Sequence, residues 1–254
     1  GSIEYLAKHC DLVYVFLDPH GGATQMRTMN VLKRLKKLEK SGNDTFAVET
    51  FLTKIKRGID LPLTVKMRTG WSHDELTIHE CVTAAYNAGC EWVAIHGRTR
   101  AQGYEGHADW GLITEVKQKA KLPIVGNGDI RTVGEAQRLL RDSGVDAVMI
   151  GRGALRNPWI FKECIGLDTN QFESPCDLLD RYLELLRAKY DLRNTIIFLR
   201  KFASWLVYGY PGAAGFRSSM YQLLTINELV QNVHIFFERV SHLPKPKFES
   251  SESF

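Results

Sequence analysis

The pattern that predicts the fold is clearest at Trp92-Val93-Ala94-Ile95-His96, which runs directly into Gly97-Arg98-Thr99-Arg100. Apolar residues over this length favour a buried strand, and the glycine with the charged residues behind it marks where the strand ends. An amphipathic stretch of helix length follows at residues 108–119. A strand, a loop and a helix in this order are typical of a parallel sheet covered by helices.

The same pattern recurs on both sides of this stretch. Further apolar runs stand at residues 12–17, 63–66, 123–127 and 147–151. With the run at 92–96 included, the ends at residues 66, 96, 127 and 151 lie 30, 31 and 24 residues apart, which suits strand-helix-strand units. Helices are expected at residues 46–57, 74–88 and 133–141. The sequence therefore predicts an α/β fold, a TIM-type (β/α) barrel that is incomplete at the N-terminus, because five strands are found where a closed barrel has eight.

The character of the chain changes after residue 170. Helical periodicity replaces strand runs at residues 177–190, 195–208 and 227–240, with a turn at 209–212. We therefore expect a barrel domain over residues 1–170, a helical domain over 171–243 and a polar tail at 244–254. An incomplete barrel has an open sheet edge with unpaired backbone groups, and a protein partner is expected to cover it.

Composition narrows the class of protein. The chain has 254 residues, 44% of them hydrophobic, and a net charge of +4 that does not by itself indicate nucleic-acid binding. Basic residues nevertheless cluster at 27–40 and between residues 181 and 217. The five cysteines are scattered without a CxxC pair, so we expect no metal site and a reducing compartment such as the cytoplasm. No apolar run approaches the ~20 residues of a membrane span, and the first residues show no signal-peptide pattern.

Polar side chains and glycines stand where the predicted strands end. Functional groups of a parallel barrel lie at these ends. The four ends read Lys66-Met67-Arg68-Thr69-Gly70-Trp71, His96-Gly97-Arg98-Thr99-Arg100, Asn127-Gly128-Asp129 and Gly151-Arg152-Gly153. Each motif alone has a structural explanation, such as a turn or a buried histidine, but four at consecutive strand ends favour a binding site. Gly128 and Gly151, with Arg152, predict a phosphate site because glycine lets backbone N–H groups approach an anion.

These motifs, in this order, resemble the tRNA-dihydrouridine synthase family, nearest its bacterial-type members. The resemblance is densest over residues 63–161, where it also includes Gln102-Gly103-Tyr104, Ala108-Asp109-Trp110 and Asn157-Pro158-Trp159-Ile160-Phe161. The helical part is similar more loosely to the family's RNA-binding helices, through residues 199–205 and 215–217. The resemblance implies an enzyme that reduces uridine in tRNA to 5,6-dihydrouridine, with FMN as cofactor and NADPH as reductant.

The resemblance also implies roles for individual residues. Lys66 and His96 would lie against the isoalloxazine and the bound uracil, and Tyr104 would stack on the flipped nucleotide. The implied cofactor-binding residues are Lys66, His96, Asn127, Gly128, Asp129, Gly151 and Arg152. The residues implied to face the substrate RNA are Arg98, Arg100, Tyr104, Arg200, Lys201 and Arg217.

One loop departs from the family pattern. The family carries a Gly-Cys-Pro loop after the strand at 12–17, whereas this chain reads Asp18-Pro19-His20-Gly21-Gly22. No cysteine of the chain matches the family's catalytic acid, and His20 is the remaining candidate proton donor on that loop because imidazole titrates near neutral pH. One alternative is a catalytically impaired descendant that serves as an RNA-binding or structural subunit. Another is a flavin barrel acting on a small molecule, which the residues at 96–100 and the basic helices disfavour.

Overall fold

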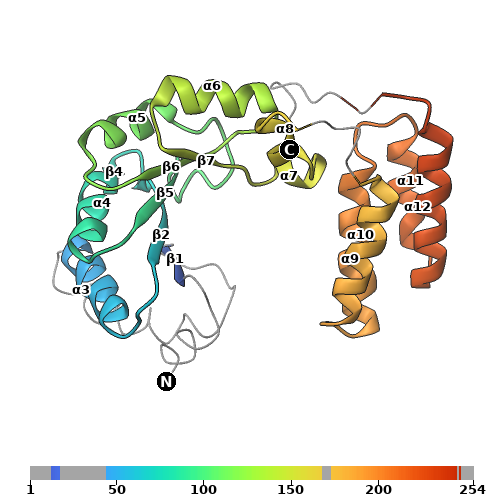
Figure 1. Cartoon of the computed structure of the whole chain (residues 1–254), viewed down its shortest axis with the longest axis horizontal. Helices are drawn as coiled ribbons and strands as arrows, with labels where there is room; N and C mark the ends of the chain where they lie inside the picture. The colour runs from blue at the N-terminus through green and yellow to red at the C-terminus, as the bar shows by residue number, and fades with distance from the viewer. Residues whose placement is uncertain (1–12, 18–43, 168–172, 245, 247–254) are drawn as a thin grey trace. The chain divides into compact units, whose positions relative to one another are not determined.

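The computed structural model describes residues 13–17, 44–167, 173–244 and 246, and Figure 1 shows its helices and strands. The chain divides into two compact units. The sheet unit is Gly1–Ile130 with Ala136–Ile150, and the helical unit is Arg131–Glu135 with Gly151–Phe254. The boundary predicted between residues 170 and 171 thus lies inside the helical unit. His20 and most of the predicted tail lie outside the described residues.

A parallel sheet forms the centre of the sheet unit. Its strands lie in the spatial order β1 (Val13–Leu17), β2 (Leu63–Arg68), β5 (Trp92–His96), β6 (Ile124–Asn127) and β7 (Ala147–Met149). All four neighbouring pairs are parallel, which confirms the predicted α/β class and its strands. Within the described residues the sheet does not close into a barrel, because β1 and β7 are its two edges.

Helices cover one face of this sheet. They are α3 (Asp44–Arg57), α4 (Ile78–Asn87) and α5 (Trp110–Lys119), as Figure 1 shows. Every second residue of β2 points toward them, and Leu63, Val65 and Met67 lie in the same buried cluster as Val93 and Ile95 of β5. The other residues of these strands therefore point to the opposite face of the sheet.

The helix predicted at residues 74–88 is wrong over its first turn. A short antiparallel hairpin of β3 (Gly70–Ser72) and β4 (Glu75–Leu76) comes first, and α4 begins at Ile78. The hairpin depends on Gly70, because a Cβ there would lie 2.2 Å from the carbonyl oxygen of Glu75. The carbonyls of Gly70 and Trp71 also accept hydrogen bonds from the N–H groups of the 97–109 loop, at 2.9 and 2.8 Å. Tertiary pairing has overridden local helix propensity here.

The helix that follows β6 has a capped N-terminus. This helix, α6 (Val133–Ser143), begins after Thr132, whose Oγ1 accepts from the backbone N–H of Glu135 at 3.1 Å. The Glu135 carboxylate accepts in return from the Thr132 N–H at 3.0 Å. This reciprocal pair is a capping box, which satisfies two N–H groups that the helix itself cannot.

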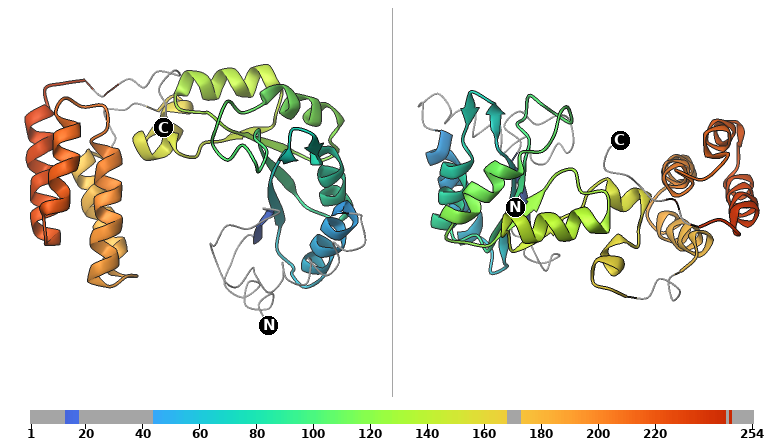
Figure 2. Two further views of the ribbon diagram at one scale, coloured as in Figure 1. Left: turned by 180° about the vertical axis from the view of Figure 1, so that it is seen from behind. Right: turned by 90° about the horizontal axis from the view of Figure 1, so that it is seen from above.

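The helical unit is a bundle with its own apolar core. Its elements are α7 (Gly153–Arg156), α8 (Ile160–Cys164), α9 (Pro175–Arg187), α10 (Leu192–Leu206), α11 (Ala213–Ser219), the 3₁₀ helix η3 (Met220–Gln222) and α12 (Ile226–Val240). The long helices α9, α10 and α12 run side by side (Figures 1 and 2) around Leu179, Leu199, Leu229 and Val233, which are fully buried. The three long helices were predicted, whereas α7, α8 and α11 were not.

Candidate active site

Polar side chains from three strands line up across the sheet. Arg68 of β2 pairs in register with His96 of β5, and His96 pairs with Asn127 of β6. Residues in register on parallel strands share a face, and Lys66 shares it too because it precedes Arg68 by two positions. This face is opposite to the one that packs under α3, α4 and α5. The structure thus brings together three of the predicted cofactor-binding residues.

His96 is a neutral imidazole at this site. Only 7% of the residue is exposed. Burial, and after it the positive charges of Lys66, Arg68 and Arg98, lower the pKa of His96 to about 3, although the carboxylate of Asp129 acts in the opposite direction. At pH 7 one ring nitrogen therefore carries a hydrogen and can donate, while the other can accept.

Lys66 brings a partly desolvated ammonium group to the same face. Burial, and then the nearby charge of Arg68, lower the pKa of Lys66 to about 8. The group stays mostly protonated at pH 7, and it would gain from any negative charge placed beside it because desolvation strengthens such an interaction. The site is therefore suited to an anionic or strongly polar edge of a ligand.

The turn after β6 brings its backbone close to His96. The Nδ2 of Asn127 donates to the Met149 carbonyl of β7 at 2.6 Å, which fixes the amide. Gly128 has a φ of 133°. A Cβ at this residue would lie 2.4 Å from the Cβ of Ala108 and 3.3 Å from Cδ2 of His96. Only glycine fits this position, both for its φ and for the space around it.

Arg98 and Asp129 lie inside the scaffold of the site. Arg98 is 2% exposed, and its Nη2 donates to Asp129 at 2.9 Å and to the Gly106 carbonyl at 2.6 Å. Asp129 accepts in addition from the N–H of Ala108 at 2.7 Å. Arg98 was expected to face a nucleotide, but its observed contacts instead fix the 97–109 loop against the turn after β6.

Tyr104 occupies the exposed part of that loop. The residue is 64% exposed, and its ring centroid lies 6.4 Å from that of His96, with 48° between the ring planes. Arg68 contacts both the loop and the ring. Its Nη1 donates to the carbonyls of Thr99 and Gly103 at 2.9 and 3.0 Å. Its Cζ lies 5.9 Å from the centroid of the Tyr104 ring. Arg68 was not among the residues predicted for the site, although strand alternation places it on the same face as Lys66.

Trp110 is a second residue of the site that was not predicted. Its Nε1 donates to the carbonyl of Gly128 at 3.0 Å. Its ring covers Gly126, where a Cβ would lie 2.5 Å from a ring carbon. Trp110 therefore holds the glycine turn from the helix side, and only its place in the family motif could have indicated this.

None of the described cysteines lies on the polar face of the sheet. Cys90 belongs to the core under the helices and Cys81 packs against it, while Cys164 and Cys176 lie in the helical unit. Burial raises the pKa of Cys90 to about 11, which keeps its thiol protonated.

Within the described part of the chain, no group of three or more histidine, cysteine or carboxylate residues could hold a metal ion. In the same residues, no helix is long and apolar enough to cross a membrane.

The remaining predicted residues are dispersed. Gly151 and Arg152 belong to the helical unit. The Arg100 backbone N–H bonds the β3–β4 hairpin. The side chain of Arg200 donates to the Leu223 carbonyl, so it ties α10 to the segment before α12, whereas Lys201 is exposed.

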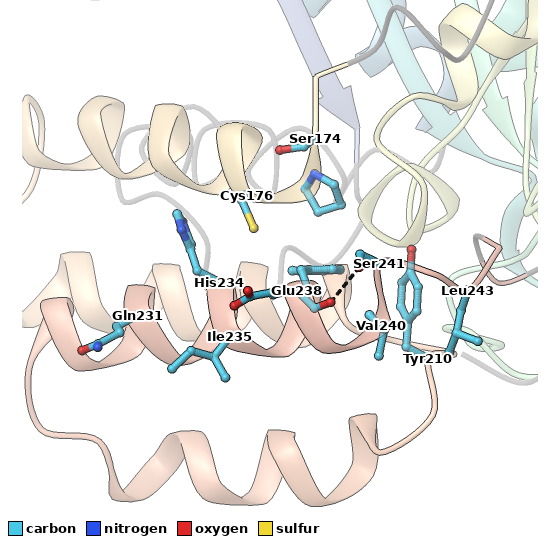
Figure 3. A pocket seen from close by; sticks show the side chains of 12 residues that line it. Ser174, Cys176, Tyr210, Gln231, His234, Ile235, Glu238, Val240, Ser241 and Leu243 are labelled. Carbon is cyan, nitrogen blue, oxygen red and sulfur yellow. Dashed lines mark hydrogen bonds between the residues drawn. The ribbon is translucent and has the colours of Figure 1, made fainter.

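A groove in the helical unit is separate from all of these residues. It has a volume of about 660 Å³ and lies between the start of α9 and the second half of α12 (Figure 3). Cys176, His234 and Glu238 are among its lining residues. His234 Nε2 lies 3.2 Å from Oδ1 of Asp180. No residue predicted for cofactor or RNA binding lines this groove.

Comparison with known proteins places the chain in a family. The chain has a parallel α/β sheet with polar side chains at its strand ends, an arrangement shared by the TIM-barrel class. The family described as "Dihydrouridine synthase (Dus)" matches residues 43–241, and the chain belongs to this family.

Named relatives agree with this assignment. The chain is 37% identical over 182 residues to tRNA-dihydrouridine synthase B of Xanthomonas campestris, covering 69% of this chain and 55% of that protein. It is 32% identical over 201 residues to the Pseudomonas aeruginosa protein of the same name, covering 76% of this chain and 60% of that protein. The chain thus spans little more than half the length of these relatives. Among solved structures, a nitroalkane oxidase from Streptomyces ansochromogenes aligns with a TM-score of 0.35 and 16% sequence identity. The alignment covers 59% of this chain and 36% of that one, and at this score it supports no conclusion about this chain.

Proposed function

We propose that the chain binds FMN against the polar strand ends and reduces uridine in tRNA to 5,6-dihydrouridine, with NADPH as reductant. The observation that carries this proposal is the row of Arg68, His96 and Asn127 in register across three strands, with Lys66 on the same face. The family assignment and the relatives named tRNA-dihydrouridine synthase support the substrate.

The residues at the strand ends fit a flavin. Its pyrimidine edge gains negative charge on reduction, and a partly buried ammonium such as that of Lys66 can stabilise such charge. His96 is neutral and can donate one hydrogen bond without adding a further cation beside Lys66. The Gly128 backbone packs directly against Ala108 and His96, where a Cβ would clash, and this contact helps to hold the His96 ring in place beside Lys66. Gly128 is proposed to bind the phosphate through its backbone N–H.

The reaction divides between the cofactor and the protein. Reduced FMN would supply the hydride for C6 of the uracil. Tyr104, exposed and close to His96, would hold the flipped base by stacking, a contact worth ~1–3 kcal/mol per base. Arg68 would keep the Tyr104 loop in place through its two carbonyl contacts. The Arg98–Asp129 pair would maintain the same loop without touching the base.

The reaction needs a donor for the proton that is added to C5 of the uracil, and the positions of the described cysteines favour a second candidate function. The described cysteines lie under the helices or in the helical unit, and none reaches the polar face. A family descendant that keeps its flavin site but serves as an RNA-binding or structural subunit would have this arrangement. Both candidate proteins would bind FMN, but only the first would convert uridine to dihydrouridine.

One experiment separates the two candidates. The purified chain is examined for flavin absorbance and then incubated with NADPH and unmodified tRNA, and dihydrouridine is measured. Bound flavin with product supports the enzyme, and flavin without product supports the non-catalytic descendant. Lys66→Met should lose flavin, whereas Lys119→Met, on the exposed side of α5, should retain it. A colourless protein that takes up no added FMN would overturn both candidates.

A further inference from the structure

The groove between α9 and α12 contains none of the residues proposed for the cofactor or the RNA. Its volume of about 660 Å³ is in the range of ligand-binding clefts. Its lining residues on α12 and the following turn begin at Gln231 and include Ser241, ten positions that span about 15 Å along the helix axis. The groove is therefore long enough for about five residues of extended chain, which advance ~3.3 Å each.

Much of the lining of this groove is apolar. The apolar lining residues are Pro175, Tyr210, Ile235, Phe237, Val240 and Leu243. Ile235 is 44% exposed, so an occupant that covers it would remove apolar surface from water, which is favourable. Burial raises the pKa of Tyr210, which keeps its phenol neutral and able to donate a hydrogen bond. The lining thus suits apolar side chains.

The charge of the groove is negative. Glu238 is one of its lining residues, and none of the described cations forms an ion pair with this carboxylate. His234 lies 3.2 Å from Asp180 of α9, so these two side chains are paired with each other. Among the described residues, no lysine or arginine lines the groove. A negative groove repels a phosphate backbone and attracts a cation, so we infer that its occupant is not RNA.

The thiol of Cys176 responds to negative charge on the other side of the groove. Figure 3 shows Cys176 of α9 pointing toward α12, and His234 of α12 pointing toward α9. Burial, and after it the carboxylates of Asp180 and Asp177, raise the pKa of Cys176 to about 11. The thiol is therefore neutral at pH 7. The two carboxylates place negative charge beside α9, in addition to the charge that Glu238 contributes from α12.

We propose that this groove binds an extended peptide segment of a protein partner, in which a lysine or arginine is flanked by apolar residues. Glu238 accepts a hydrogen bond from the basic side chain, and the apolar side chains on either side of it cover Ile235 and Tyr210. The exposed amide of Gln231 supplies both a donor and an acceptor, which a peptide backbone requires. A small amine would pair with Glu238 but leave the apolar lining in water, which favours a peptide. This inference does not depend on the proposed RNA substrate.

The test measures the fluorescence anisotropy of four labelled peptides in which lysine, arginine, glutamine or glutamate stands between leucine and phenylalanine. The lysine and arginine peptides should bind, and the glutamate peptide should not. Glu238→Gln should weaken binding of the lysine peptide on the order of 5-fold, because the ion pair remains partly in water. Ile235→Ser should weaken it as well, through lost apolar contact.

Two matched controls lie outside the groove. Glu184→Gln removes an exposed carboxylate from α9, and Ile197→Ser removes a side chain of α10 that is 48% exposed. Both variants should bind the lysine peptide like the unsubstituted chain. Thermal unfolding at the temperature of the unsubstituted chain shows that each variant is folded.

Several outcomes would overturn the proposal. Equal affinity for the lysine and glutamate peptides would do so, as would an unchanged affinity for the lysine peptide in Glu238→Gln. Butylamine that binds as tightly as the lysine peptide would show a site for a small amine. Stronger peptide binding after removal of residues 245–254 would show that a segment of this chain, not a partner, is the occupant. Binding of none of the four peptides would also overturn the proposal.

Discussion

The two units hold a buried arginine in different ways. In the sheet unit, Arg98 is paired with Asp129 and with loop carbonyls, so its charge is balanced by hydrogen-bonded oxygen atoms. In the helical unit, Arg156 is just as buried but stacks on Tyr208. The first arrangement fixes a loop in one conformation, whereas the second packs two helical segments together. Under the proposed function, this difference corresponds to cofactor binding in the sheet unit and RNA binding in the helical unit.

The largest expected effect comes from breaking the Arg98–Asp129 pair. Arg98→Met leaves a largely buried carboxylate without its cation, so the free energy of unfolding should fall by about 3–5 kcal/mol. Arg156→Met should cost about 1–2 kcal/mol, because it removes stacking on an aromatic ring. Urea unfolding of both variants measures the difference. Equal losses would show that the two arginines are held alike.

Gly128 tests how closely the backbone must approach His96. Gly128→Ala forces a side chain into a φ of 133° and against Ala108, which should cost about 2–4 kcal/mol and abolish flavin binding. Gly134→Ala is the matched control, because nothing lies within 4 Å of its Cβ position. That change should stabilise α6 by up to about 1 kcal/mol. Normal flavin binding by Gly128→Ala would show that the glycine turn is not part of the flavin site.

His96 makes the stability of the sheet unit depend on pH. Its folded pKa of about 3 lies below the unfolded value of about 6.5, so the unfolded chain binds a proton that the folded chain does not. Stability should therefore fall as pH drops below 6.5, by about 3 kcal/mol at pH 4. His96→Gln should remove this part of the pH dependence. An unchanged pH profile in that variant would show that His96 is not held neutral.

The smallest expected effect concerns the start of α12. The Thr225 hydroxyl accepts from the Glu228 N–H at 3.2 Å, and the Glu228 carboxylate accepts from the Thr225 N–H at 2.9 Å. Thr225→Ala should lower the stability of the helical unit by about 1 kcal/mol and leave flavin content unchanged. A loss of flavin in this variant would contradict the division of roles between the units.

Sequence alone predicted the strands better than the connections between them. Strand ends at residues 96 and 127 match the structure, because a buried run followed by a polar turn is a local signal. The β3–β4 hairpin was missed because it depends on pairing with the 97–109 loop, which is distant along the chain.

The candidate site shows the same limit. Lys66, His96 and Asn127 could be grouped because each stands near a strand end. The burial of Arg98 could not be predicted, since the sequence does not show that Asp129 lies opposite it. Arg68 could have been found from alternation along β2.

The contact between Trp110 and the glycine turn also makes this site observable in solution. The indole N–H is bonded to Gly128, so its fluorescence emission should report on the solvent and hydrogen bonding at that turn. A difference between the spectra of the unsubstituted chain and Trp110→Phe isolates this signal from that of the other four tryptophans. Titration with a ligand can then be followed from inside the sheet unit without any attached label.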